Sequence, residues 1–150
     1  MTRLLDVNVL VALAWPNHVH HAAAHRWFRA NRNRGWATCP LTESGFVRVS
    51  SNRRAIPEAC TPDEAIALLR RIRGLAGHVF WADDISPTDP RAAPFQRVTG
   101  YRQVTDAHLL ALAMRHGGRL ATFDRGLAEL AGPEGRSAVL VIGPRPSLGD

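Results

Sequence analysis

The chain has 150 residues, of which 45% are hydrophobic, so it is long enough for one domain with its own core and too apolar to be disordered. Its two cysteines, Cys39 and Cys60, form no CxxC pair, which argues against a disulfide scaffold or a thiolate zinc site and fits a reducing cytoplasm. All 19 basic residues are arginine, against 13 acids, and the net charge of +6 indicates a nucleic-acid partner, although a GC-rich genome also favours arginine over lysine.

The first third of the chain alternates short strands with helices. A buried strand is expected at 2–7, followed by a helix at 8–15 with Asn8 near its cap. This apolar run is too short to span a bilayer and is closed by Pro16, and we expect neither a signal peptide nor a membrane segment. A longer helix follows at 17–32, then a strand at 35–40 and a helix at 41–51 capped by Thr42.

The remaining two thirds repeat this alternation. The clearest helix, 61–77, begins at the cap Thr61 with Pro62 in its first position and ends at glycine. A strand at 78–83 leads into a proline-rich loop at 84–94. A helix at 104–118 with Thr105 as cap, a strand at 119–124, a short helix at 125–130 and a strand at 137–143 complete the chain. The pattern predicts an α/β fold over 1–150, a single domain with a parallel five-stranded sheet covered on both faces.

The helix at 17–32 has two faces at helical spacing. The apolar stripe consists of Val19, Ala23, Trp27 and Ala30, and the polar stripe of His21, His25, Arg29 and Arg32. His21 and His25 have the i, i+4 spacing of a zinc pair, but no third ligand is evident nearby. A solvated or RNA-facing helix edge is therefore the favoured interpretation.

Four acids fall where parallel sheets place active sites, beyond the carboxyl ends of the strands. Asp6 and Asp124 end two strands, while Glu43 and Asp106 lie in the first turns of helices. Capping or a turn could account for each of the last three alone, but Asp6 lies in an apolar run where an ionised carboxylate is costly. Because four carboxylates in one pocket repel each other strongly, they need protons or a divalent cation, and an all-oxygen ligand set favours Mg²⁺ or Mn²⁺.

Three segments of the chain resemble the motifs of PIN-domain proteins of the VapC toxin type. These are "LLDVNVLVALAW", "LTESGFVRV" and "VTDAHLLALAMRHGGRLATFD". The resemblance implies a three-layer α/β/α sandwich and a metal-dependent endoribonuclease that acts as the toxin of a toxin–antitoxin pair. By motif, the acidic quartet is Asp6, Glu43, Asp106 and Asp124, with Asn8 and Thr122 as supports. The resemblance also implies an antitoxin partner and a homodimer, while 53–103 carries no motif that we can match.

Metal chemistry predicts the products. A metal-bound water attacking the phosphate in line would leave a 5′-phosphate and a 3′-hydroxyl. Two alternatives stay open. The first is a non-catalytic RNA-binding or partner-binding module on the same fold. The second is a haloacid-dehalogenase-like phosphohydrolase, although Asn8 stands where that class carries a second aspartate and the chain has no lysine.

Several other side chains have an ordinary structural interpretation. Trp27, Trp36 and Phe80 are expected in the core, whereas Trp15, beside Pro16, is a candidate for an interface. The arginine cluster Arg70, Arg71 and Arg73 is expected to be a solvated helix face, and Asp83 and Asp84 to be solvated loop acids.

Overall fold

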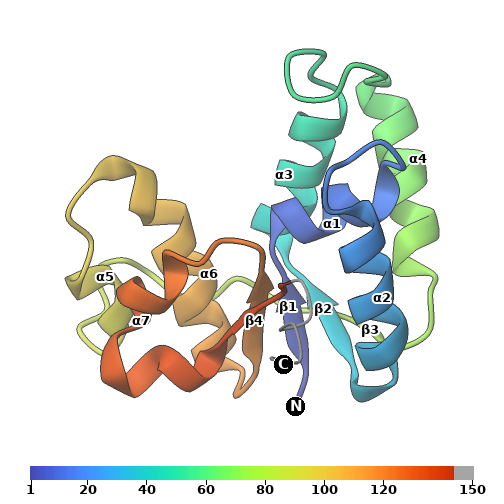
Figure 1. Cartoon of the computed structure of the whole chain (residues 1–150). Coiled ribbons are helices and arrows are strands. Elements are labelled where there is room, and N and C mark those ends of the chain that lie inside the picture. The colour runs from blue at the N-terminus through green and yellow to red at the C-terminus, as the bar shows by residue number, and fades with distance from the viewer. Residues whose placement is uncertain (144–150) are drawn as a thin grey trace, which may run out of the picture.

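The structure, a computed structural model, describes residues 1–143 as one parallel five-stranded sheet flanked by helices (Figure 1). The spatial order of the strands is β3-β2-β1-β4-β5. Their bounds are β1 Arg3–Leu5, β2 Trp36–Thr38, β3 His78–Phe80, β4 Arg119–Thr122 and β5 Val139–Val141. The first β1 residue, Arg3, lies opposite Trp36 of β2 and Arg119 of β4, so the three central strands start level.

Helices cover both faces of the sheet, which confirms the predicted sandwich. On one side lie α1 (Val7–Ala14), α2 (His21–Asn31), α3 (Pro40–Ser50) and α4 (Pro62–Arg73). On the other lie α5 (Ala93–Gln96), α6 (Val104–Arg115) and α7 (Leu127–Gly135). Three 3₁₀ turns, at Arg32–Arg34, Tyr101–Gln103 and Arg136–Ala138, join these elements. The expected domain end at 150 lies outside the described residues.

Alternate residues of the central strands β1 and β4 supply two separate cores. Leu4 and Leu120 face α6 and α7, whereas Leu5 and Ala121 face α1 and α3. Because side chains alternate along a strand, a short strand can serve both cores when nearly every position is apolar. The three residues of β1 are all buried, so this strand anchors the residues that follow it.

Helix starts are partly as predicted. Thr61 caps α4, accepting a hydrogen bond from the Glu64 N–H at 3.3 Å. The other caps were misassigned. Asp6, rather than Asn8, caps α1. Helix α3 begins at Pro40, which is favourable at a first helical position, so Thr42 lies one turn inside and bonds back to Cys39.

Helix α6 begins one residue before its predicted cap, Thr105, which makes no capping bond because the preceding 3₁₀ turn already leads the backbone into the helix. The last helix extends beyond the predicted 125–130 and ends at Gly135, with a kink at Gly132. Gly132 has φ +64°, and a Cβ there would lie 2.2 Å from the Arg97 guanidinium carbon, so a larger residue would have to displace that side chain.

Helix α2 corrects the predicted stripes. It starts at His21, and its buried residues are Ala24 and Phe28, while Val19 lies before the helix and is 86% exposed. Residues of the predicted polar stripe instead pack toward α1: ring nitrogens of His21 and His25 lie 2.7 and 2.9 Å from the backbone oxygens of Ala12 and Leu13. These contacts hold α2 against the last turn of α1, whose backbone carbonyls have no partner within the helix.

The predictions for the aromatic side chains are confirmed in part. Trp36 is buried and Trp27 is partly buried, as expected. Phe80 is 44% exposed and lies under the Arg73 guanidinium at 5.1 Å, which contradicts its assignment to the core. The reason is topological, because β3 is an edge strand of the sheet. No helix within 1–143 is long and apolar enough to cross a membrane.

Candidate active site

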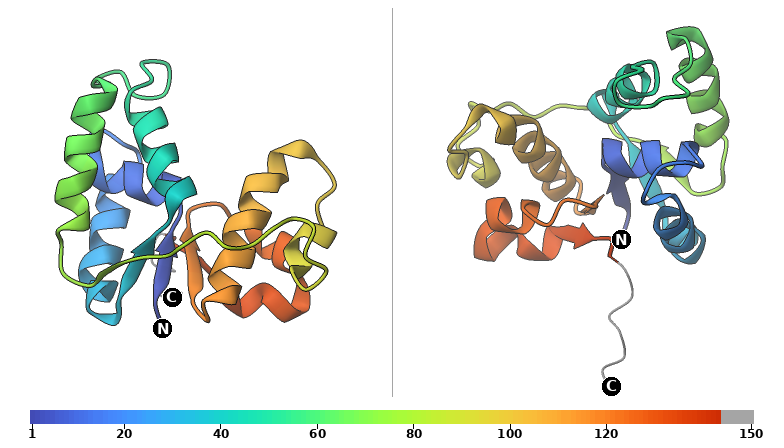
Figure 2. Two further views of the ribbon diagram at one scale, coloured as in Figure 1. Left: turned by 180° about the vertical axis from the view of Figure 1, so that it is seen from behind. Right: turned by 45° about the horizontal axis from the view of Figure 1, so that its top comes forward.

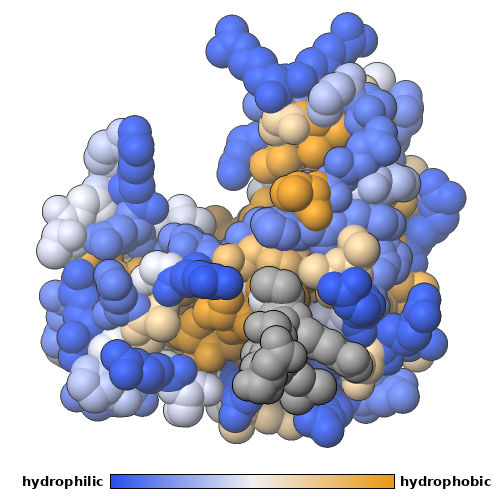
Figure 3. All heavy atoms as spheres, in the orientation of Figure 1, coloured by the Kyte–Doolittle hydropathy of each residue, from blue (hydrophilic) through white to orange (hydrophobic). Residues whose placement is uncertain are grey.

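The carboxyl ends of β1, β2 and β4 open into a notch between two groups of helices. Figure 3 shows this notch from the front, with hydrophilic side chains on both rims, and Figure 2 shows the same division from behind and from above. The first residue after β1, Asp6, is 7% exposed. Its Oδ1 accepts a hydrogen bond of 2.7 Å from the Val7 N–H, and its Oδ2 accepts one of 2.7 Å from the Thr122 hydroxyl.

Burial decides the electrostatic state of Asp6. Burial raises the pKa of this carboxyl, the Thr122 and Val7 hydrogen bonds lower it, and the charge of Asp124 raises it. The net shift is upward. A buried acid with a raised pKa and two hydrogen bonds is oriented but not neutralised by the surrounding side chains.

Thr122 joins the two central strands. Its Oγ donates to Asp6 and accepts hydrogen bonds from the Asn8 side-chain amide (3.4 Å) and the Asp124 N–H (3.0 Å). The Asn8 Oδ1 in turn accepts the Phe123 N–H at 3.4 Å. The two residues predicted as supports are therefore in contact with each other and hold the β4 end against the start of α1.

Asp106 and Asp124 complete a group of three. Asp106 lies in the first turn of α6, and its pKa is raised to about 6 by partial burial and by the charges of Asp6 and Asp124. Asp124 is exposed and accepts the Gly126 N–H at 2.8 Å. We call Asp6, Asp106 and Asp124 the aspartate trio. Within residues 1–143 none of its members forms an ion pair.

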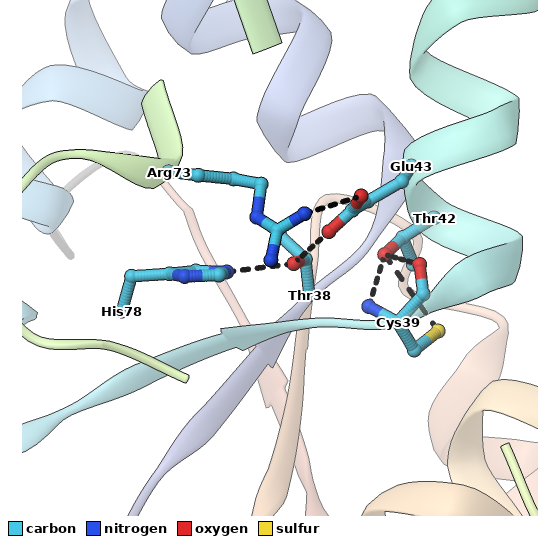
Figure 4. Close-up of polar contacts among 6 residues, drawn as sticks. All are labelled: Thr38, Cys39, Thr42, Glu43, Arg73 and His78. Atoms are coloured by element: carbon cyan, nitrogen blue, oxygen red, sulfur yellow. Dashed lines mark hydrogen bonds and ion pairs between the residues drawn. The ribbon is translucent and has the colours of Figure 1, made fainter. Parts of the chain in front are cut away.

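The fourth predicted acid, Glu43, has a different environment (Figure 4). Its Oε2 accepts a hydrogen bond of 2.5 Å from the Thr38 hydroxyl, and its Oε1 lies 3.4 Å from Nη1 of Arg73 in α4. The Thr38 oxygen also lies 2.7 Å from Nε2 of His78. The pKa of His78 is lowered by burial and by the Arg73 charge, which outweigh the opposite effect of Glu43. Glu43 is not among the charges that raise the pKa of Asp106.

Sequence reasoning missed Thr38, Arg73 and His78 as neighbours of this site. Thr38 is the last residue of β2, just as Asp6 is the first residue after β1. The predicted strands could therefore have indicated that Thr38 lies at the same edge of the sheet. Arg73 was assigned to a solvated face, and nothing local indicates that it reaches an acid 30 residues away in sequence. The loop acids Asp83 and Asp84 are exposed, as predicted, and they also lie 2.7 and 2.8 Å from His108 and Arg115 of α6.

The donor set fits a hard divalent cation, although the described residues hold no ready-made cage. Within 1–143 no three His, Cys, Asp or Glu side chains converge closely enough to hold a metal ion. The zinc pair considered for His21 and His25 gains no third ligand there. The aspartate trio nevertheless offers oxygen donors with no neutralising cation, and this is the chemistry that Mg²⁺ and Mn²⁺ prefer.

The parallel sheet and the acids at the carboxyl ends of its strands define a class of protein. Comparison with known proteins shows which family this is. The PIN domain family model matches residues 3–133. The chain is 56% identical to Ribonuclease VapC39 of Mycobacterium tuberculosis (strain ATCC 25618 / H37Rv) over 131 residues, 87% of this chain and 94% of that protein. It is 56% identical to Ribonuclease VapC38 over 85% of this chain and 89% of that one, and 44% identical to Ribonuclease VapC44 over 89% and 93%, both from the same strain. The chain belongs to the PIN-domain family, among its VapC members.

Proposed function

We propose that this protein is an endoribonuclease that uses Mg²⁺ or Mn²⁺ and acts as the toxin of a toxin–antitoxin pair. The observation that carries the proposal is the aspartate trio, three acids from distant parts of the chain at the carboxyl edge of the sheet that form no ion pair within residues 1–143. The VapC relatives named ribonucleases support it, as does the arginine-rich composition, which suits a polyanionic substrate.

The trio, together with Glu43, would hold the cation. When bound, a divalent cation supplies charge neutralisation at the phosphate and lowers the pKa of an attacking water. The chain's own contribution is orientation: Val7 and Thr122 fix both oxygens of Asp6. Asp106 must lose its proton to bind a cation, which its pKa of about 6 allows at neutral pH. We expect products with a 5′-phosphate and a 3′-hydroxyl.

The test is cleavage of RNA by the purified protein with Mg²⁺, with Mn²⁺ and with a chelator, followed by analysis of the fragment ends. Cleavage only with metal, giving 5′-phosphate ends, supports the proposal. Fragments with 2′,3′-cyclic phosphate would exclude a metal-activated water. Binding of RNA without cleavage supports the non-catalytic alternative, and turnover of a small phosphate ester in place of RNA supports the phosphohydrolase.

We further propose a homodimer and an antitoxin that covers the notch, both in the cytoplasm. Two domains side by side would double the arginine-lined track for RNA. The candidate contact is Trp15 with the residues before α2. Trp15 donates its indole N–H to Ser50 at 3.0 Å and, with the exposed Val19 and with Ile56, lines a groove. Sedimentation of the protein alone and with the product of the upstream reading frame tests both claims. A monomer that forms no complex contradicts them.

A further inference from the structure

A pocket beside the aspartate trio has no role in the cation site. Its volume is about 340 Å³. Aromatic rings of His20 and Phe123, the side chains of Arg26 and Arg125, and an apolar lining that includes Ala23 and Ile142 surround it. We call it the side pocket. It lies next to the candidate active site because Phe123 is the residue between Thr122 and Asp124.

Two stacked rings form one wall of the side pocket. The ring centroids of His20 and Phe123 are 4.5 Å apart, and the planes differ by 15°. His20 is exposed and Phe123 is partly buried, so the stacked pair is accessible from solvent. The backbone N–H of Phe123 is bound by Asn8, which also binds Thr122, so the backbone of Phe123 is tied to the residues that surround the carboxylates.

The chemistry of the side pocket suits a flat ring that carries a negative charge. Aromatic faces bind nucleobases by stacking without regard to sequence, and guanidinium groups bind phosphate and stack on bases as well. Arg26 and Arg125 are exposed, and within 1–143 neither forms an ion pair. An acidic peptide would satisfy the two arginines but would leave the stacked rings and the apolar lining without a partner.

We propose that the side pocket binds the base of a nucleotide next to the scissile phosphate, with His20 and Phe123 as a stacking platform and Arg26 and Arg125 as phosphate contacts. This inference rests on the proposed ribonuclease function and deepens it. RNA-cleaving sites need unstacked bases to be splayed onto the protein, and a platform one residue from Asp124 places such a base beside the reacting phosphate. Efficient cleavage therefore requires a base on one side of the cut.

The first experiment combines variants with modified RNA. An RNA that the wild type cuts at a mapped position is prepared with an abasic ribose on either side of the cut. Loss of stacking on one base is worth about 5- to 150-fold in binding. We expect a loss of this size for the wild type with one of the two abasic RNAs, and the same loss for Phe123→Leu or His20→Ala with intact RNA. The two losses should not add, because they remove the same contact.

Matched controls separate stacking from damage to the site. Phe123→Tyr and His20→Phe keep a flat ring and should retain more cleavage of intact RNA than Phe123→Leu and His20→Ala. Arg136→Ala removes an exposed arginine from the 3₁₀ turn Arg136–Ala138, outside the side pocket, and should be neutral, whereas Arg26→Ala should weaken binding. Additive losses, or equal cleavage of both abasic RNAs and intact RNA, would overturn the proposal. So would variants that weaken only the association with an antitoxin, because the side pocket would then be a protein-docking site.

A second experiment does not depend on cleavage. The metal-free protein is titrated with adenosine 5′-monophosphate, uridine 5′-monophosphate and ribose 5-phosphate, while the NMR signals of Phe123 and His20 are followed. Signal shifts with either nucleotide that are absent with ribose 5-phosphate and lost in Phe123→Leu support the stacking platform. This result would hold even if the wild type cleaves no RNA. In that case only the proposed ribonuclease function would fail. If RNA is cleaved but no nucleotide shifts these signals, the side-pocket proposal fails and the ribonuclease proposal stands.

Discussion

The acids predicted to act together lie in two electrostatic environments. In the aspartate trio, Asp6 and Asp106 have raised pKa values because burial and neighbouring carboxylates disfavour their charged forms. Glu43, by contrast, is bound by the Arg73 guanidinium and the Thr38 hydroxyl. Within residues 1–143 the trio forms no ion pair, whereas Glu43 is paired with an arginine of the chain.

The two environments affect the stability of the folded state in opposite directions. Like charges in a shared pocket destabilise the folded state until a cation or a proton neutralises them. A carboxylate with an arginine and a hydroxyl donor has its interactions already and gains less from a cation. We therefore expect the trio to dominate cation binding, and Glu43 to contribute according to how far it can leave Arg73. Three variants and one pH dependence test this comparison.

The largest effect is expected for Asp106→Asn. RNA cleavage should fall by more than the about 10- to 100-fold that loss of a supporting group costs at metal sites, because this residue is proposed as a ligand itself. The melting temperature of the metal-free protein should rise, since one repelling charge is removed. The control is Asp63→Asn, which removes an exposed first-turn acid from α4 and should change neither quantity. Undiminished cleavage by Asp106→Asn would contradict the assignment of Asp106 as a ligand of the cation.

The pH dependence of stability gives the next effect. An unfolded aspartate has a pKa of about 3.9, and in the folded protein that of Asp106 is raised to about 6. The folded state therefore holds a proton that the unfolded state releases. This contribution to stability is fully present below about pH 4 and is lost as pH rises through about 6. The gain in melting temperature of Asp106→Asn over wild type should thus be larger at pH 7.5 than at pH 4.5, measured without metal. An equal gain at both pH values would refute the repulsion.

On the Glu43 side, Thr38→Val should have an intermediate effect. Valine keeps the shape of the buried side chain but removes the hydroxyl that contacts both Glu43 and His78. Leaving buried polar groups without a partner costs about 1–3 kcal/mol of unfolding free energy. Chemical denaturation measures this loss, and cleavage assays show whether the position of Glu43 matters. Thr38→Ser keeps the hydroxyl and should retain more cleavage activity than Thr38→Val. Equal activity of the two variants would show that the hydrogen bond from residue 38 does not position Glu43 for cleavage.

The smallest effect is expected for Arg73→Met. The Arg73 side chain is 42% exposed, so its ion pair with Glu43 is screened and worth about 1 kcal/mol or less. Its stacking on Phe80 adds a comparable amount. We expect a small drop in melting temperature that shrinks at high salt, with Arg70→Met, an exposed neighbour on the same helix, as the neutral control. A tighter affinity for Mn²⁺ in Arg73→Met would show that Arg73 competes with the cation for Glu43.

Local patterns determined much of this protein. A buried strand followed by Asp6 and Asn8, the Thr61–Pro62 start of α4, and the alternation of strands and helices are features of neighbouring residues. These features predicted the sandwich and the sheet edge at which the acids lie. Residues predicted as supports, Asn8 and Thr122, are in contact because parallel neighbouring strands end at the same edge.

Only the tertiary structure decided which groups face each other across the sheet edge. The pairing of Glu43 with Arg73 joins α3 to α4, and the stack of His20 on Phe123 joins a loop to the end of β4. The buried face of α2 likewise depends on how its histidines meet α1. Such contacts depend on the packing of whole elements, because no spacing within one helix or strand encodes the position of another. The sequence supplied the acids, and the packing decided which of them form no ion pair with the described part of the chain.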